Sequence, residues 1–118
     1  MKTTSENPVK DPSVRTVVDH ARVSEKSIER YVVEQSRIRG LFCLKYSNPA
    51  LAGFPDRILV LPAGRVVWVE LKSAGRRPTE LQNIRIARLR NMGHRVEVID
   101  SKDGVDRLLN DITSGHAI

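Results

Sequence analysis

The chain alternates between segments whose apolar residues recur at helical spacing and short segments dense in β-branched residues. Helical spacing bounded by a serine or threonine and a glycine is typical of an amphipathic helix, whereas β-branched runs between turn-forming residues favour strands. In chain order, the pattern predicts a helix over 24–39, strands over 41–46, 57–61 and 65–72, a helix over 79–92, a strand over 95–100 and a helix over 103–112. This order, α-β-β-β-α-β-α, predicts an α/β fold with a mixed sheet flanked by helices.

Two of these segments carry apolar residues on more than one side. The strand over 65–72 has them on both faces, which predicts burial on both sides, with Trp68 in the core. The apolar residues of the helix over 79–92 are spread around its axis, so burial on more than one side is expected. Cys43, inside an apolar strand, is expected to be a buried small hydrophobe.

The 118-residue length fits one domain with one core. Residues 1–22 are polar, contain Pro8 and Pro12 and show no sustained period. We therefore expect a flexible N-terminal arm over 1–22 and a single domain over 23–118.

Lys and Arg total 20 against 14 Asp and Glu, and this net charge of +6 favours an anionic partner such as nucleic acid. A solvated basic surface without a partner is the alternative. No apolar run approaches the roughly 20 residues that cross a bilayer, and the first residues lack the apolar stretch of a signal peptide. Cys43 is the only cysteine, so neither an internal disulfide nor a cysteine-based zinc site is expected. These features predict a cytoplasmic protein without a membrane partner.

The short Pro-Ala-Gly segment at 62–64 predicts a β-hairpin between the second and third strands. With the loop centred on Ala63, the expected cross-strand pairs are Val60–Val66, Ile58–Trp68 and Asp56–Glu70. Opposed residues have their Cβ atoms roughly 5 Å apart, and the strand period puts Lys72 on the same face as Glu70. One patch of the sheet is therefore expected to present Asp56, Glu70 and Lys72 together.

Two opposed carboxylates repel each other unless a cation lies between them. Mg²⁺ takes oxygen ligands and keeps several waters, and it can orient a phosphate and lower the pKa of a bound water. With Lys72 beside the pair, the spacing suits metal-assisted hydrolysis of a phosphodiester. The alternative is a solvated hairpin end, but a strand buried on both faces should not end in unpaired charges without a purpose.

These residues resemble those of a known nuclease family. Gly53-Phe54-Pro55-Asp56, Glu70-Leu71-Lys72, Gly75 and Gln82 are similar to the motif of the VRR-Nuc (virus-type replication-repair nuclease) domain, a branch of the PD-(D/E)xK nuclease superfamily. The resemblance spans residues 24–101 and includes the α-β-β-β-α-β order. It implies a restriction-endonuclease-like core with an added C-terminal helix. The short length is similar to that of standalone phage-type members, which implies the cytoplasm of a bacterial or phage-infected cell.

The resemblance implies a Mg²⁺- or Mn²⁺-dependent endonuclease. Asp56 and Glu70 would be metal ligands, with the carbonyl of Leu71 as a further ligand, and Lys72 would be the catalytic lysine. Such sites also carry an acidic residue on the first helix, with a catalytic and metal-binding role. Glu29 is the first choice for it, and Glu25, one helical turn earlier, is the alternative.

Gln82 has two expected roles that compete for its side chain. Thr79 and Gln82 have the spacing of a capping box at a helix start, whereas the family pattern implies that Gln82 borders the active site and takes part in catalysis. Arg76 and Arg77, close to Lys72, are candidate contacts for DNA phosphates.

Lys45 and Ser47 follow the first strand and are also expected to point toward the site and to contact DNA. The resemblance implies branched DNA as substrate, with a four-way (Holliday) junction as first choice, and a homodimer that supplies two active sites. No small-molecule cofactor is expected. The rival enzyme is a PD-(D/E)xK nuclease of flap, nicking or restriction type, and the rival of another class is a non-catalytic DNA-binding module.

Overall fold

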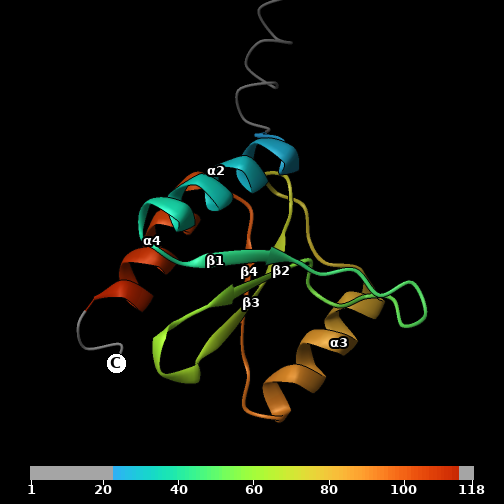
Figure 1. Cartoon of the computed structure of the whole chain (residues 1–118). Helices are drawn as coiled ribbons and strands as arrows, with labels where there is room; N and C mark the ends of the chain where they lie inside the picture. The colour runs from blue at the N-terminus through green and yellow to red at the C-terminus, as the bar shows by residue number, and fades with distance from the viewer. Residues whose placement is uncertain (1–22, 115–118) are drawn as a thin grey trace, which may run out of the picture.

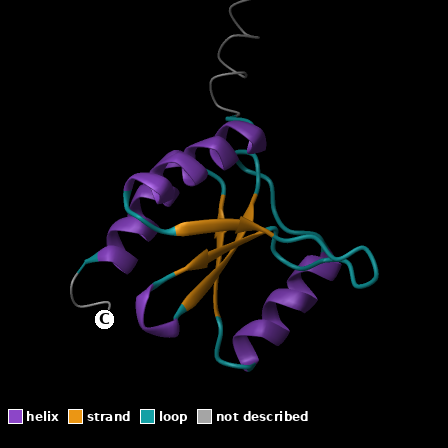
Figure 2. Ribbon diagram, in the orientation of Figure 1, coloured by secondary structure: helices purple, strands orange, loops and turns teal. Residues whose placement is uncertain are grey.

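The computed structural model describes residues 23–114, which form a sheet between helices (Figure 1 and Figure 2). In chain order the elements are α2 (Glu25–Ile38), β1 (Phe42–Lys45), β2 (Arg57–Val60), the short 3₁₀ turn η1 (Pro62–Gly64), β3 (Val66–Leu71), α3 (Glu80–Asn91), β4 (Arg95–Ile99) and α4 (Lys102–Thr113). This sequence of elements confirms the predicted α/β order. No helix within residues 23–114 combines the length and apolar character needed to span a membrane.

The strands form one four-stranded mixed sheet in the order β1-β2-β3-β4. The first three strands are antiparallel neighbours, and β4 returns through α3 to lie parallel to β3. The expected hairpin register is confirmed, because Ile58 pairs with Trp68 and Val60 pairs with Val66. The same register puts Asp56, immediately before β2, opposite Glu70 near the end of β3.

Helices α2 and α4 pack against one face of the sheet and form the main core (Figure 1). Ser24 caps α2 by accepting a hydrogen bond from the backbone of Ser27, as the start of the predicted helix requires. The main core consists of buried aliphatic residues: Ile28, Val32, Leu59, Leu61, Val67, Val69, Leu71, Ile99, Val105, Leu108, Leu109 and Ile112. This layer fixes β2 and β3, whose ends carry the candidate site.

The opposite face is covered only in part, by α3. Ile86 and Leu89 of α3 pack with Val96 of β4 in a second, small cluster, against which Phe54 and Trp68 also pack. The expectation of burial on several sides of this helix is wrong, because its other large apolar residues, Leu81, Ile84 and Met92, are exposed. Helix α3 lies against β4 and buries only the side that carries Ile86 and Leu89.

The partial cover also changes two expectations for single residues. Trp68 is half-buried at the edge of the second cluster, so β3 is fully buried on one face only. Cys43 is half-buried as well, because β1 is an edge strand with no further described strand beside it.

Candidate active site

A tight loop fixes Asp56 at the start of β2. Gly53 has φ +97°, a conformation that favours glycine, and a Cβ atom there would lie 2.8 Å from Cγ of Leu81 on α3. Arg85 of α3 donates a hydrogen bond of 2.9 Å to the carbonyl of Ala52. The loop is thus held against α3 directly before the segment that carries Asp56.

Asp56 and Glu70 lie together at this end of the hairpin. The Asp56 Oδ1 atom accepts a hydrogen bond of 3.4 Å from the backbone N–H of Leu71, the residue after Glu70. Burial raises the pKa of Asp56. Glu70 is only 3% exposed, and burial, followed by the negative charge of Asp56, raises its pKa to about 7. A buried carboxylate beside a second one is the arrangement that a cation would stabilise.

Two nitrogen atoms converge on one oxygen of Glu70. The Lys72 Nζ atom lies 3.4 Å from Glu70 Oε2, and Gln82 Nε2 donates a hydrogen bond of 2.9 Å to the same oxygen. Because both contacts fall on Oε2, the described residues give Glu70 Oε1 no hydrogen-bond partner. The structure therefore brings Asp56, Glu70, Lys72 and Gln82 together.

The capping box at the start of α3 is confirmed, but the expected competition for Gln82 is wrong. Gln82 Oε1 accepts a hydrogen bond of 2.8 Å from the Thr79 backbone N–H, while its Nε2 donates to Glu70. An amide has an acceptor and a donor on different atoms, so one side chain makes both contacts. The N-terminus of α3 is thereby tied to Glu70.

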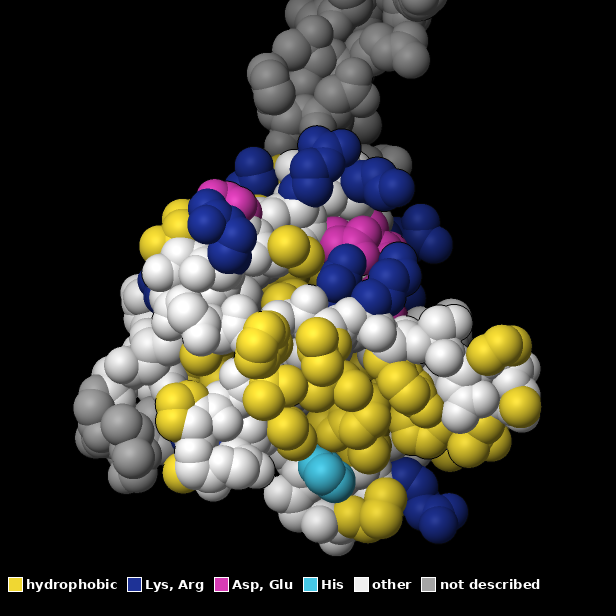
Figure 3. All heavy atoms as spheres, viewed as in Figure 1, with side chains coloured by type: hydrophobic (Ala, Val, Ile, Leu, Met, Phe, Trp, Pro, Cys, Tyr) yellow, Lys and Arg dark blue, Asp and Glu magenta, His cyan; other side chains and the backbone are white. Residues whose placement is uncertain are grey.

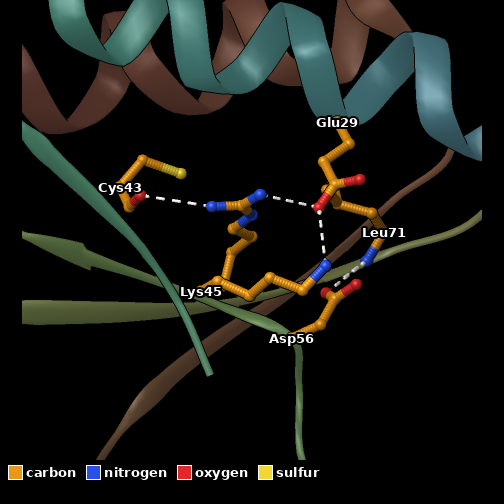
Figure 4. A network of polar contacts seen from close by, with 6 residues as sticks. Glu29, Cys43, Lys45, Asp56 and Leu71 are labelled. Carbon is orange, nitrogen blue, oxygen red and sulfur yellow. Dashed lines mark hydrogen bonds and ion pairs between the residues drawn. The ribbon is translucent and has the colours of Figure 1, made fainter. Parts of the chain in front are cut away.

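Glu29 lies in a different network, on the α2 side of the sheet (Figure 4). Arg57 Nη2 donates a hydrogen bond of 2.7 Å to Glu29 Oε2, and Lys45 Nζ is 3.6 Å from the same oxygen. Arg57 Nη1 also donates to the carbonyl of Cys43, at 3.3 Å. The hydrogen bond from Arg57 lowers the pKa of Glu29. Glu29 is thus an ionised partner of two cations and makes no contact with Glu70.

Arg57 was not among the residues that the sequence pattern indicated for the site. It follows Asp56 directly, so the strand period turns it to the opposite face, toward α2. A charged residue on the core face of a strand needs a partner of opposite charge, so this alternation predicts an acidic partner for Arg57 without saying which residue it is.

The charge of Glu25, one turn before Glu29, acts on both carboxylates of the hairpin. Its negative charge contributes to the raised pKa of Asp56 and to that of Glu70. The first turn of α2 therefore adds negative potential to the same place.

On the face that Figure 3 shows, Lys and Arg side chains surround a group of acidic side chains. Arg76 and Arg77 are exposed on the loop between β3 and α3, which is held by a hydrogen bond of 3.1 Å from the Gly75 N–H to Asp100. Lys45 and Ser47 are exposed at the end of β1, beside the segment in which Tyr46 N–H donates to the Asp56 carbonyl. Such a rim can contact a phosphate backbone.

Within residues 23–114, no three His, Cys, Asp or Glu side chains gather closely enough to form a metal site by themselves. Asp56 and Glu70 still fit a hard cation, because Mg²⁺ is commonly held by one or two carboxylates together with waters. Carboxylate oxygens, with a backbone carbonyl as the further ligand, are the donors that this ion prefers.

Comparisons with known proteins identify the family of this chain. The chain matches the model of a family described as the VRR-NUC domain over residues 7–103; the first part of that range lies outside the described residues. The relative named "Putative nuclease p44", from Acyrthosiphon pisum secondary endosymbiont phage 1, is 41% identical over 81 residues, which are 69% of this chain and 87% of that protein. A solved structure described as a VRR_NUC domain is 29% identical, covers 75% of this chain and 96% of its own, and superposes with a TM-score of 0.69. The expected resemblance is confirmed, and the chain belongs to the VRR-NUC domain family of nucleases.

Proposed function

We propose that this member of a nuclease family is a Mg²⁺- or Mn²⁺-dependent endonuclease that hydrolyses phosphodiester bonds in branched DNA, in the manner of a Holliday-junction resolvase. The observation that carries the proposal is the pair Asp56 and Glu70, opposed across the hairpin with Glu70 3% exposed and its pKa raised to about 7. Such a pair is unfavourable in the ionised form without a cation. A divalent ion would offset both charges.

Asp56, Glu70 and the carbonyl of Leu71 would hold the ion, with waters as the remaining ligands. When bound, the ion supplies charge that stabilises the transition state and a water molecule of lowered pKa. Lys72 and Gln82 both contact Glu70 Oε2, which leaves Oε1 available to a ligand. The Lys72 ammonium, 3.4 Å from that carboxylate, is in position to bind a phosphate oxygen or to assist removal of a proton from the attacking water.

The acidic residue that α2 contributes is better supplied by Glu25 than by Glu29. The Glu29 carboxylate is bonded to Arg57 at 2.7 Å and lies 3.6 Å from Lys45, so binding a metal ion would break these contacts. Glu25 is exposed in the first turn and has no such cationic partner among the described residues. Its charge adds to the raised pKa of both Asp56 and Glu70, although the charge of Glu29 also adds to that of Asp56. We therefore assign Glu29 the structural role and Glu25 the role near the metal.

The exposed polar and basic residues around the site support DNA as the substrate. Arg76 and Arg77 would contact phosphates on one side of the site, and Lys45 and Ser47 on the other, because cationic contacts supply most of the sequence-independent affinity for DNA. A symmetric cut of a four-way junction needs two sites at a fixed separation, which a two-fold homodimer provides. The phage relative supports the expectation of a role in the cytoplasm of a bacterial or phage-infected cell.

A substrate panel tests the proposal. Four-way junction, fork, flap, linear duplex and single strand are each incubated with the protein and Mg²⁺ or Mn²⁺, beside the variants Asp56→Asn and Asp103→Asn. Asp103 is an exposed aspartate of α4, paired with Arg107, and serves as the matched control. We expect paired nicks on the junction with the wild type and with Asp103→Asn, and none with Asp56→Asn.

Other results separate the alternatives. Cleavage of a flap or duplex in preference to the junction would support phosphodiester hydrolysis and refute the four-way junction as the preferred substrate. Junction binding without cleavage in either metal would overturn the enzymatic proposal in favour of a DNA-binding module.

A further inference from the structure

The loop between β1 and β2 contains a pocket that the candidate catalytic residues do not line. Residues 46–49 and 51–54 line it, and its volume is about 290 Å³. We name it the loop pocket. Figure 1 shows the loop reaching outward past the first turn of α3, and the loop leads directly into Asp56. Small-ligand sites have volumes of about 300–1,000 Å³, so a pocket at the lower end of this range suits a single ring system.

The loop pocket is preformed. Asn48 forms a turn, since the Leu51 N–H donates to its carbonyl and to its Oδ1 atom, each at 3.1 Å. Asn48 Nδ2 donates a hydrogen bond of 3.0 Å to the Tyr46 hydroxyl. The other side of the loop is held to α3 by Arg85, which donates to the Ala52 carbonyl at 2.9 Å. A loop that is held on both sides loses little conformational freedom when a ligand binds.

The residues that line the pocket favour a flat and uncharged ring. Tyr46 and Phe54 pack edge to face with their ring centroids 5.9 Å apart, and both are half-buried. Leu51, which is 45% exposed, adds apolar surface, and Ser47 and Asn48 add a hydroxyl and an amide. Aromatic and apolar side chains with a few polar groups are what proteins use to hold a nucleobase outside its stack.

The charges around the pocket fit the same ligand. No residue of 46–55 is charged, in a chain of which 29% of the residues are Asp, Glu, Lys or Arg. Cations lie beside the loop instead, since Lys45 directly precedes it and the Arg85 guanidinium lies 5.5 Å from the centre of the Phe54 ring. A neutral pocket bordered by cations matches a nucleotide, whose base is neutral and whose phosphate is anionic.

We propose that the loop pocket binds an unpaired base of the DNA substrate, next to the phosphodiester at the metal site. The inference rests on the proposed function, because Asp56 at the end of the same loop is what relates the pocket to a cleaved bond. A base in an intact duplex enters such a pocket only at the cost of unpairing and unstacking. That cost is smaller at a branch point, where stacking is interrupted, so the pocket would favour branched DNA over linear duplex.

The experiment measures the affinity of the full chain for a forked DNA by fluorescence anisotropy, in a chelator and at low salt, so that the DNA stays intact. An abasic residue replaces, in turn, each of the first three unpaired nucleotides of either arm. The wild type is compared with Leu51→Ala, which removes part of the pocket wall, and with Ala52→Leu, which narrows the pocket. Ala50→Leu is the matched control, because Ala50 is exposed in the same loop but does not line the pocket.

We expect an abasic residue at one of these positions to lower the affinity of the wild type and of Ala50→Leu about tenfold, the size of a base–aromatic stacking contribution. Leu51→Ala and Ala52→Leu should bind the unmodified fork about tenfold more weakly than the wild type and should no longer distinguish it from the abasic fork. Their affinity for linear duplex should be unchanged. Circular dichroism and thermal unfolding establish that each variant is folded.

Equal affinity of the wild type for the unmodified fork and for every abasic fork overturns the proposal. It is also overturned if both folded pocket variants keep the dependence on the base, or if Ala50→Leu loses that dependence equally. Cleavage of the same forks in Mg²⁺ or Mn²⁺ is measured separately. Base-dependent binding without cleavage keeps the pocket and refutes the nuclease proposal, whereas cleavage by a wild type without base-dependent binding does the reverse.

Discussion

Replacement of Glu70 by glutamine is expected to stabilise the metal-free protein at alkaline pH. The pKa of Glu70 is raised from 4.5 to about 7, chiefly by burial and then by the charge of Asp56. The folded state therefore holds a proton that the unfolded state has already lost between these pH values. The free energy of unfolding must fall as the pH rises through this window, because the folded state then binds more protons than the unfolded state.

The magnitude follows from the two pKa values. A rise from 4.5 to about 7 corresponds to about 3 kcal/mol of stability that is present below pH 4.5 and lost above pH 7. Glutamine keeps the oxygen that accepts from Gln82 and loses the charge, so Glu70→Gln should lack this dependence. The difference in stability between the variant and the wild type should grow by about 3 kcal/mol from pH 4.5 to pH 8. Asp56, whose pKa is also raised by burial, gives both proteins a decline of the same sign.

Urea unfolding in a chelator, at intervals from pH 4.5 to pH 8, measures this difference. Glu80→Gln is the control, because Glu80 is exposed in the first turn of α3 and its substitution removes the same charge without touching Asp56 or Glu70. Added Mg²⁺ at pH 8 should restore the wild type and leave Glu70→Gln unchanged. Parallel pH curves for the wild type and Glu70→Gln would refute the reasoning, since Glu70 would then be ionised throughout.

Four further substitutions test the site. Lys72→Met should lower kcat by about 10²- to 10⁴-fold while metal affinity, measured by calorimetry, changes little; unchanged kcat would remove Lys72 from the chemistry. Glu25→Gln should weaken metal affinity about 10- to 100-fold with stability unchanged, whereas Glu29→Gln should cost about 2 kcal/mol of stability by depriving Arg57 of its partner; the opposite pattern would return the metal role to Glu29. Gly53→Ala should destabilise by about 2 kcal/mol and lower activity, because its Cβ would lie 2.8 Å from Leu81. The control Gly64→Ala, also at positive φ but with nothing within 4 Å of its Cβ, should cost about 1 kcal/mol, and equal losses would deny the contact with Leu81 any role.

Those parts of the fold that depend on local periodicity could be predicted from the sequence. The hairpin register follows from a short loop and strict alternation, so the opposition of Asp56 and Glu70 could be predicted from the sequence. The pairing of Glu29 with Arg57 was not, because it depends on the rotation of α2 above the sheet, which a helical pattern leaves open.

The exposed apolar residues of α3 could not be predicted from the sequence for a similar reason. Periodicity tells which residues of a helix share a side, but the width of sheet beneath them is a property of the whole fold. Leu81 and Met92 are exposed because α3 lies toward β4 and no element covers its outer side among the described residues. The double role of Gln82 likewise required the distance between the α3 N-terminus and the end of β3.

Because Gln82 links Glu70 to the first turn of α3, the stability of that turn should depend on whether Glu70 binds a ligand. The Thr79 amide hydrogen bonds to Gln82 Oε1, and the same side chain holds Glu70 through its other end. Fraying of the first turn of α3 would break both contacts, so anything that tightens the hold on Glu70 must also slow that fraying. Amide hydrogen exchange at Thr79 and Gln82 should therefore slow when Glu70 is engaged, which allows occupancy of the site to be read from backbone protons that lie outside it.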